Sequence, residues 1–509
     1  MSDALDRGIT VTEIAPMDSP IDVAPESTAA FVGRALRGPL NTPVLVESYA
    51  AFHRRFGGTW QRSSLGPAVQ QFFEHGGKRL YVVRVANNAR GAMICLPAIG
   101  GFLVLRALEP GSTESIRAAI DYDGIDINEQ RFNLTIQRVA PGTGFVLDQE
   151  IYRGLTCEEG ELGFIADELA SSMLIRAQMP LPAGRPAKTN EKYIEHVQPG
   201  TDGFSLSDYD LVGCAFRNTG LFALNEVDHF DLLYLPPPGR DRDPGPAAIL
   251  AAELYCRKRG AMLVMDPPRE WKSVRKAVEG VRALDYSSPN IFTYFPRVYD
   301  RSEEVAVPRV AGAAIAGLMC KLDRHHGSWE DLDQPGFGLR RSLVPALHLN
   351  VDDAQMLVRE GVNVIAGRTA GRAMVCGSVT LARSGQLEST YSSLTVRRLC
   401  LDLTNTIDLA TRWTVFAPNT TAVAERVTSL IHAYMCALLD AGAFEDEMFV
   451  VQCDAGLHSR AVNRNRGVTV LLVFHPAGSD HPLSLTVHQT TTGCRVATTA
   501  FAPVFQKVA

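Results

Sequence analysis

Few residues in this sequence have the types and spacing of a catalytic centre. Asp266 follows an apolar run in "AMLVMDPP", which predicts a carboxylate at the carboxyl end of a strand, where α/β enzymes often keep catalytic groups. No partner acid, base or glycine-rich loop accompanies it, so a carboxylate in a proline-anchored turn is the favoured interpretation. Ser479, Asp480 and His481 are adjacent in sequence, whereas the members of a catalytic triad meet in space, so a turn is predicted there.

Motifs that bind phosphates, dinucleotides or metals are incomplete. "EHGGKR" lacks the first glycine and the final serine or threonine of a phosphate-binding loop, and "GFGLRR" breaks off a dinucleotide motif. "LDRHHGSW", with His325 and His326, is predicted to be a loop, and none of the ten cysteines forms a CxxC pair. We therefore predict no catalytic residue, no cofactor and no metal, and this result favours a structural role over an enzyme.

Charge and hydropathy exclude two further classes of protein. The formal net charge is −6 and Lys and Arg do not cluster, so direct binding of nucleic acid is not expected. The N-terminus lacks the basic start and apolar core of a signal peptide. The longest weakly polar runs are shorter than the ~20 residues of a membrane helix. The chain is therefore expected to be made in the cytoplasm, without stable insertion in a membrane.

The first four hundred or so residues are predicted to form three parts. Residues 27–86 have the pattern strand, strand, helix, helix, strand, which indicates an α/β segment. Residues 87–200 are predicted to be a mainly β insertion with one helix at residues 161–178. Residues 201–389 alternate strands and helices, which predicts a central α/β domain with a parallel sheet.

Residues 390–490 are predicted to form an α+β domain. Helices are expected at residues 391–410 and 420–442, the second capped by Asn419 or Thr420 and ended by Gly442, and a strand is expected at 412–419. Three more strands follow. The second helix has an apolar stripe at helical spacing: Val423, Val427, Leu430, Ile431, Tyr434 and Leu438.

Both ends of the chain are predicted to be extended. Residues 1–26 begin with a strand in "RGITVTEIAP", where Ile9 and Val11 share one face and Ile14 lies on the other, followed by a Pro-rich linker. Residues 491–509, with Val496 and Phe501, form a last extended run without a successor. No hairpin turn follows the N-terminal strand, yet its backbone N–H and C=O groups need partners.

Several of these stretches resemble one known family. "RGITVTEIAP", "AAFVGRALRGPLNTPVLVESYAAFHRRFGG", "LGPAVQQFFEHGGKRLYVVRV", "RWTVFAPNTTAVAERVTSLIHAYMCALLDAGAF" and "FVVQCDAG" are similar, in this order, to blocks of contractile tail sheath proteins. Such proteins occur in contractile phages, tailocins and extracellular injection systems. The sequence departs from the family at residues 310–312, where Pro-Ser-Gly is usual, and at residues 377–380, where Gly-Ala-Arg-Thr is usual.

The resemblance implies an α/β and α+β multidomain fold whose C-terminal mixed sheet is completed by strands from neighbouring subunits. It implies a homo-oligomer of hexameric rings, stacked helically around an inner tail tube protein, with baseplate and tail terminator proteins as further partners. Such a sheath is assembled in the host cytoplasm, belongs to the virion, and contracts from a metastable extended state to drive the tube through a cell envelope. A sheath of a phage-derived injection system or tailocin is one alternative, and an α/β hydrolase-like or nucleotide-binding enzyme based on Asp266 is another.

The resemblance also implies functional residues. Ile9, Val11, Ile14, Val496 and Phe501 would lie in arms that exchange strands between subunits. Because the C-terminal domain faces the tube in this family, the polar stripe of the second helix is a candidate tube contact. Glu425, Ser429, His432, Cys436 and Asp440 line this face, and Glu425, Ser429 and His432 are the candidate tube contacts. Plain exposure to solvent is the alternative for this face. Cys436 on that helix and Cys494 in the arm are candidates for disulfides between subunits, since a released particle meets an oxidising medium.

Overall fold

The chain divides into two compact units. The computed structural model describes residues 26–126, 128–140, 142–190, 192–284, 286–302, 307–369, 371–382, 391–417, 420–453, 468–490 and 493–499. The larger unit holds Glu26–His325 and Asp331–Arg383, and the smaller unit holds His326–Glu330 and the chain from Ser384 on. The predicted N-terminal strand with Ile9, Val11 and Ile14, and also Phe501, lie outside the described residues.

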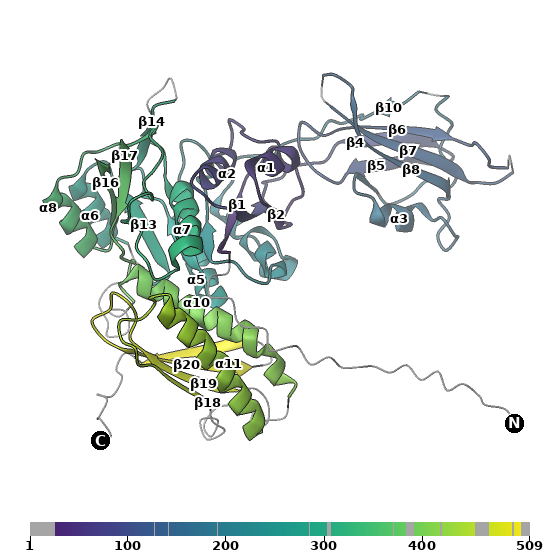
Figure 1. The fold of residues 1–509 in the computed structure, drawn as a ribbon. Helices are drawn as coiled ribbons and strands as arrows, with labels where there is room; N and C mark the ends of the chain where they lie inside the picture. The colour runs from purple at the N-terminus through teal and green to yellow at the C-terminus, as the bar shows by residue number, and fades with distance from the viewer. Residues whose placement is uncertain are drawn as a thin grey trace, which may run out of the picture. The chain divides into compact units, whose positions relative to one another are not determined.

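An eight-stranded sheet forms the centre of the larger unit (Figure 1). The strands follow the order β17-β16-β13-β12-β11-β1-β3-β2, and neighbours are parallel except for the pairs β2–β3 and β16–β17. Their bounds are Thr28–Gly33 (β1), Val44–Val46 (β2), Arg79–Arg84 (β3), Leu232–Tyr234 (β11), Met262–Met265 (β12), Ile291–Phe295 (β13), Asn363–Thr369 (β16) and Arg372–Cys376 (β17). The parallel sheet predicted from the alternation of strands and helices is therefore present.

Strands from two sequence segments that were predicted as separate parts share this sheet. β1, from residues 27–86, pairs with β11, from residues 201–389, with Ala30 opposite Leu233. Residues 87–200 are inserted between them. The two ends of the insertion lie side by side. Arg90 and Thr201 exchange backbone hydrogen bonds of 3.1 and 2.8 Å, and Asn87 forms a β-bridge with Phe204.

Helices pack on the sheet with the end signals that the sequence provides. Helix α5 (Pro246–Arg259) begins with a proline directly after Gly245. It is followed by Gly260, whose φ of 65° is the left-handed conformation typical of a helix stop. The other long elements of this unit are α1 (Tyr49–Phe56), α2 (Leu65–Glu74), α6 (Val274–Arg282), α7 (Gly312–His326) and α8 (Val351–Arg359). Short helical segments are α4 (Asp208–Val212), η2 (Ala215–Arg217) and η3 (Gly220–Glu226).

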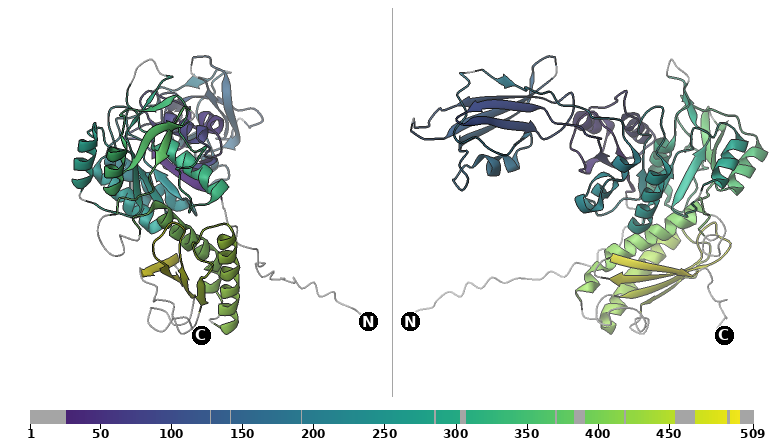
Figure 2. Two further views of the ribbon diagram at one scale, coloured as in Figure 1. Left: turned by 60° about the vertical axis from the view of Figure 1, so that its left-hand side comes forward. Right: turned by 180° about the vertical axis from the view of Figure 1, so that it is seen from behind.

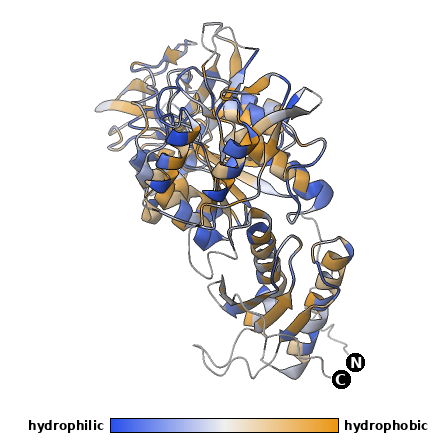
Figure 3. Ribbon diagram, turned by 90° about the vertical axis from the view of Figure 1, so that its left-hand side faces the viewer, coloured by the Kyte–Doolittle hydropathy of each residue, from blue (hydrophilic) through white to orange (hydrophobic). Residues whose placement is uncertain are grey.

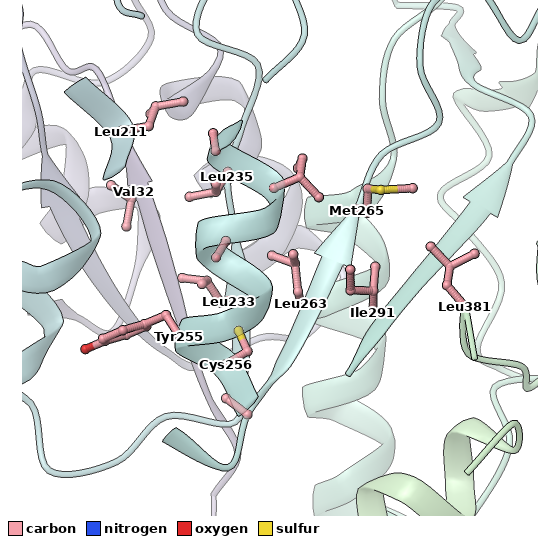
Figure 4. Packing of buried hydrophobic residues seen from close by; sticks show 14 of the residues in the cluster. Val32, Leu211, Leu233, Leu235, Tyr255, Cys256, Leu263, Met265, Ile291 and Leu381 are labelled. Atoms are coloured by element: carbon pink, nitrogen blue, oxygen red, sulfur yellow. The ribbon is translucent and has the colours of Figure 1, made fainter. Parts of the chain in front are cut away.

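The core between sheet and helices is apolar and closed to solvent. Leu233, Leu263 and Ile291 lie on adjacent strands and belong to one buried cluster with Tyr255 and Cys256 of α5 (Figure 4). Burial of such side chains stabilises a fold by about 1.5–3 kcal/mol each. β13 ends at Phe295 and a separate strand, β14 (Val298–Asp300), follows, because Pro296 between them has no N–H to donate. β14 pairs instead with β15 (Leu343–Pro345).

Residues 93–195 form two antiparallel sheets, drawn from two further sides in Figure 2. One has the order β4-β5-β9 and the other β10-β6-β7-β8. The elements are β4 (Met93–Ala98), β5 (Gly101–Ala107), β6 (Ser115–Asp121), β7 (Phe132–Val139), β8 (Val146–Leu155), α3 (Ile165–Glu168), η1 (Leu169–Ser171), β9 (Ile175–Ala177) and β10 (Ile194–Glu195). Their inner faces make an apolar core of their own.

The helix predicted at residues 161–178 is wrong in length. α3 and η1 end at Ser171, and Ile175–Ala177 form β9, which pairs with Leu105–Ala107 of β5. Ile175 is fully buried. Pairing with β5 therefore outweighs the helical preference of the sequence.

The smaller unit places two helices on one face of a four-stranded sheet (Figures 1 and 2). The helices are α10 (Leu394–Thr411), continued by η4 (Arg412–Val415), and α11 (Thr421–Asp440). The antiparallel sheet has the order β18-β19-β20-β21, with bounds Val450–Cys453, Thr469–Phe474, Leu483–Thr490 and Gly493–Thr499. Hydrophobic and hydrophilic residues alternate along the helices (Figure 3), and the apolar ones form one core that includes Trp329.

The strand predicted at residues 412–419 is wrong, because α10 continues there as the short helix η4. The hydroxyl of Thr411 donates to the carbonyl of Ile407, and that of Thr414 donates to the carbonyl of Thr411, both at 2.7 Å. Thr414 and Val415 are buried. Local side-chain bonds and burial thus extend the helical path by one turn.

Candidate assembly surfaces

The edges of the four-stranded sheet are the first candidate surface. Within the described residues, β18 and β21 each pair on one side, β18 with β19 and β21 with β20. The free side of an edge strand presents N–H and C=O groups that another strand can use. An added strand would gain main-chain hydrogen bonds and place alternate side chains on the two faces.

Val496 lies in β21 and not in a free arm. It is opposite Val487 of β20, and the last pair of this hairpin joins Thr490 to Gly493. Two residues separate these partners in sequence, a common spacing for a hairpin connection. In a single chain β20 is the nearest partner along the sequence, and an exchange of β21 between subunits stays a prediction.

Helix α11 presents the second candidate surface. The hydroxyl of Thr420 accepts a hydrogen bond from the N–H of Val423 at 3.4 Å, which fixes the N-terminus predicted from the sequence. Gly442, with a φ of 86°, follows the last turn. The predicted apolar stripe is buried at Val427, Ile431, Tyr434 and Leu438, and half-buried at Val423 and Leu430.

The polar stripe of α11 is exposed in the chain. Glu425, Ser429 and His432 carry a carboxylate, a hydroxyl and an imidazole at successive turns of one helix face. His432 Nδ1 lies 3.5 Å from the Sγ of Cys436, and its ring lies 5.1 Å from that of Phe449. This arrangement can hydrogen-bond to a partner surface of mixed polarity.

The two cysteines of the predicted disulfides lie on different elements, Cys436 on α11 and Cys494 on β21. Cys436 is a half-buried free thiol. Cys494 lies in β21, opposite Gln489 of β20. A pairing between subunits stays a prediction.

Among the described helices, α11 is long and apolar enough for a membrane span by length and composition, with 20 residues and a mean hydropathy of 1.2. Its apolar stripe packs in the core of the smaller unit, and one such helix is weak support for a span, because core helices of soluble proteins pass the same test.

Asp266, the candidate catalytic carboxylate, holds three elements together. Its carboxylate accepts a hydrogen bond from the hydroxyl of Tyr234 at 2.6 Å and from the N–H of Gly312 at 3.0 Å. Burial raises the pKa of Asp266 to about 6, although both hydrogen bonds and the nearby Arg297 lower it. A Cβ on Gly312 would lie 2.6 Å from the carboxylate oxygen, so glycine is needed there. The carboxylate thus joins the ends of β11 and β12 to the start of α7, as expected of a structural turn.

The structure confirms the predicted turn at residues 479–481 but not the predicted loop at His325 and His326. Ser479 donates its hydroxyl to the carbonyl of His481 at 2.9 Å, within the predicted turn between β19 and β20. His325 and His326 form the end of α7, so the predicted loop is wrong. In the part of the chain that the structure describes, no group of three or more His, Cys, Asp or Glu side chains could hold a metal ion.

The fold is found in solved structures of tail sheaths. A sheath tail protein from Listeria innocua shares 13% identity, with a TM-score of 0.61, over 92% of this chain and 96% of the other. This observation decides the fold.

The chain has the fold of tail sheath proteins. The sheath of an extracellular contractile injection system named PVC matches 92% of this chain and 94% of its own, at 13% identity and a TM-score of 0.53. The helical sheath of the anti-feeding prophage matches 93% and 96%, at 14% identity and a TM-score of 0.54. No family model matches the chain, and no curated protein matches it by sequence. The likeness expected from five stretches of sequence therefore extends over most of the chain.

Proposed function

We propose that this protein is a structural subunit of a contractile sheath and not an enzyme. The observation that carries the proposal is the sheath fold over 92–93% of the chain, shared with the PVC and anti-feeding prophage sheaths. The subunits polymerise as hexameric rings stacked helically around an inner tail tube protein. The extended polymer is metastable, and its contraction drives the tube through the envelope of a target cell.

Strand exchange links the subunits in this proposal. The N-terminal arm, with Ile9, Val11 and Ile14, adds a strand to an edge of the four-stranded sheet of a neighbour. The C-terminal arm, with Val496 and Phe501, exchanges in the same way by leaving its own β20 for that of a neighbour. Head-to-tail contacts that do not close into a ring generate helical assemblies.

The exposed stripe of α11 contacts the inner tube. Glu425, Ser429 and His432 provide its polar groups. In particles that have left the cell, Cys436 and Cys494 form disulfides between subunits. Baseplate and tail terminator proteins bind the two ends of the polymer.

The sheath belongs either to a virion, assembled in the host cytoplasm, or to a phage-derived injection system or tailocin. The structures of similar fold include both a sheath tail protein and sheaths of injection systems. Capsid and terminase genes beside the gene for this chain would favour a virion. The enzyme alternative has little support, because the carboxylate of Asp266 is engaged by Tyr234 and Gly312.

Deletion of residues 1–20 tests the proposal. The truncated chain is expected to stay a folded monomer by circular dichroism and sedimentation velocity, and to form no tubes by electron microscopy. Deletion of residues 1–6, which stops before the predicted strand, is the matched control and is expected to polymerise. Tubes formed by the longer deletion would refute strand exchange by this arm, and dispersed monomers of the full chain mixed with its tube protein would contradict the sheath role.

A further inference from the structure

A cavity of about 180 Å³ lies in the larger unit, beside the carboxyl ends of β11, β12 and β13. Ligands of open α/β sheets commonly bind outside this edge of the strands. No motif in the sequence predicts this site. The residues that line it come from the start of α2, from the end of β11 and the segments that follow these three strands, and from residues 307–310.

Positive charge dominates the cavity. Arg240, Arg269 and Arg297 follow three adjacent strands, one arginine after each, and Arg309 comes from the segment that pairs with Val298. Among the described residues that line the cavity there is no aspartate or glutamate. A guanidinium stays charged at neutral pH and binds oxyanions through a fork of N–H donors.

The arginines are held in place by the protein. The side chain of Arg297 is 10% exposed and donates to the carbonyl of Pro267 at 2.8 and 3.0 Å and to the carboxylate of Asp243 at 2.7 Å. The same carboxylate accepts the backbone N–H of Arg269 at 2.9 Å, and Arg269 donates to the carbonyl of Arg240. The carboxylate of Asp243 thus holds the guanidinium of Arg297 and the backbone of Arg269, and it offsets a single positive charge.

The N-terminus of α2 also lines the cavity. Ser64 precedes the ten residues of this helix and makes no side-chain cap, and Pro67 and Ala68 of the first turn also line the cavity. The positive end of a helix dipole attracts anions, as arginines do. Apolar atoms of Tyr234, Pro237 and Pro308 supply a non-polar part of the wall.

We propose that this cavity binds a phosphate group, carried by a small molecule whose apolar body lies against the proline- and valine-rich wall. The arginines neutralise the phosphate charge, and the fixed positions of Arg269 and Arg297 reduce the entropy lost on binding. Free phosphate and an organic phosphate share this chemistry, and the test distinguishes them. The site is independent of the sheath role, because it lies within one subunit.

Calorimetric titration of the purified full chain in low-salt buffer tests the proposal, with inorganic phosphate and phenyl phosphate as the probes. Saturable binding of one equivalent is expected for both probes, with higher affinity for phenyl phosphate and a loss of affinity as NaCl is added. Arg269→Gln is expected to weaken binding about tenfold or more, because it removes a charge-assisted hydrogen bond. Equal affinity for the two probes would refute the role of the apolar wall.

Two further variants separate the loss of phosphate binding from a general loss of charge and from misfolding. Arg275→Gln removes the same charge from the exposed face of α6, where Arg275 pairs with Glu279, and is expected to leave phosphate binding unchanged. Arg240→Gln alters an exposed lining residue, so a loss of affinity there cannot be ascribed to misfolding if the circular dichroism spectrum is that of the parent. Absence of saturable binding, or equal weakening by Arg275→Gln, would overturn the proposal.

Discussion

Replacement of Arg84 by methionine is expected to destabilise the larger unit strongly. Arg84 is 2% exposed, and its guanidinium donates to four backbone carbonyls. The distances are 3.1 Å to Ala35, 2.5 Å to Gly38, 2.7 Å to Pro110 and 3.3 Å to Leu36. Methionine fills similar space but provides no hydrogen-bond donor. The loss in the free energy of unfolding is therefore set by the four carbonyls that no longer accept a hydrogen bond from residue 84.

The magnitude follows from that count of bonds. A net 1–1.5 kcal/mol for each of the four hydrogen bonds gives a loss of about 4–6 kcal/mol. Burial lowers the pKa of Arg84 to about 10, opposed by Glu109 and Glu114, so the side chain is charged at neutral pH. Arg84→Lys keeps the charge but loses the planar fork, and about half of the destabilisation is expected.

Urea unfolding of the monomeric chain, followed by circular dichroism, measures the effect. With a slope of about 3 kcal/mol per molar urea, a loss of 4 kcal/mol lowers the midpoint by about 1.3 M. Arg79→Met is the matched control, because Arg79 lies at the other end of the same strand and is partly exposed; a change below about 0.5 kcal/mol is expected. A free energy of unfolding for Arg84→Met within 1 kcal/mol of the parent would refute the reasoning.

Three further predictions concern the smaller unit. Glu425→Lys is expected to reduce the fraction of sheaths loaded with tube in electron micrographs, and unchanged loading would count against the tube contact. Purified particles are expected to show dimers on non-reducing gels that disappear with reductant or with Cys494→Ser, whereas monomer alone would contradict the disulfides. Burial lowers the pKa of His475, but hydrogen bonds to Asp446 and to a backbone carbonyl outweigh it and raise the pKa above 6.5. The stabilisation by this pair is therefore complete below pH 6.5 and is lost as the pH rises through the folded pKa. Melting curves are expected to show that the free energy of unfolding falls by about 0.5 kcal/mol over this rise in pH, and that Asp446→Asn lacks this fall.

Sequence patterns predict the fold where one local signal decides the element. The apolar stripe of α11 and its cap at Thr420 define that helix, and Gly260 marks the end of α5. The prediction fails where contacts from elsewhere decide. Ile175 joins a strand because β5 offers a partner far away in sequence, and no local pattern contains that information.

The same limit applies to the candidate sites. The position of Asp266 after a strand is visible in the sequence, but its partners Tyr234 and Gly312 lie 32 and 46 residues away. The arginines of the cavity are spread in the same way, and each one alone resembles an ordinary surface charge. Their recurrence after three successive strands is the signal that could have revealed the site, once the strands are known to be adjacent.

Residues 87–200 begin and end at adjacent positions of the larger unit, so this insertion can be exchanged as a whole. Asn87 bridges to Phe204 and Arg90 to Thr201, so the two crossings lie beside each other, whatever length of chain lies between them. Loop-closure entropy changes slowly with length, and the insertion has its own core. A guest domain with neighbouring termini can therefore take its place, once it supplies a carbonyl for Arg84 of β3 where Pro110 now does. The insertion is thus the part of the larger unit at which new surface properties can be added.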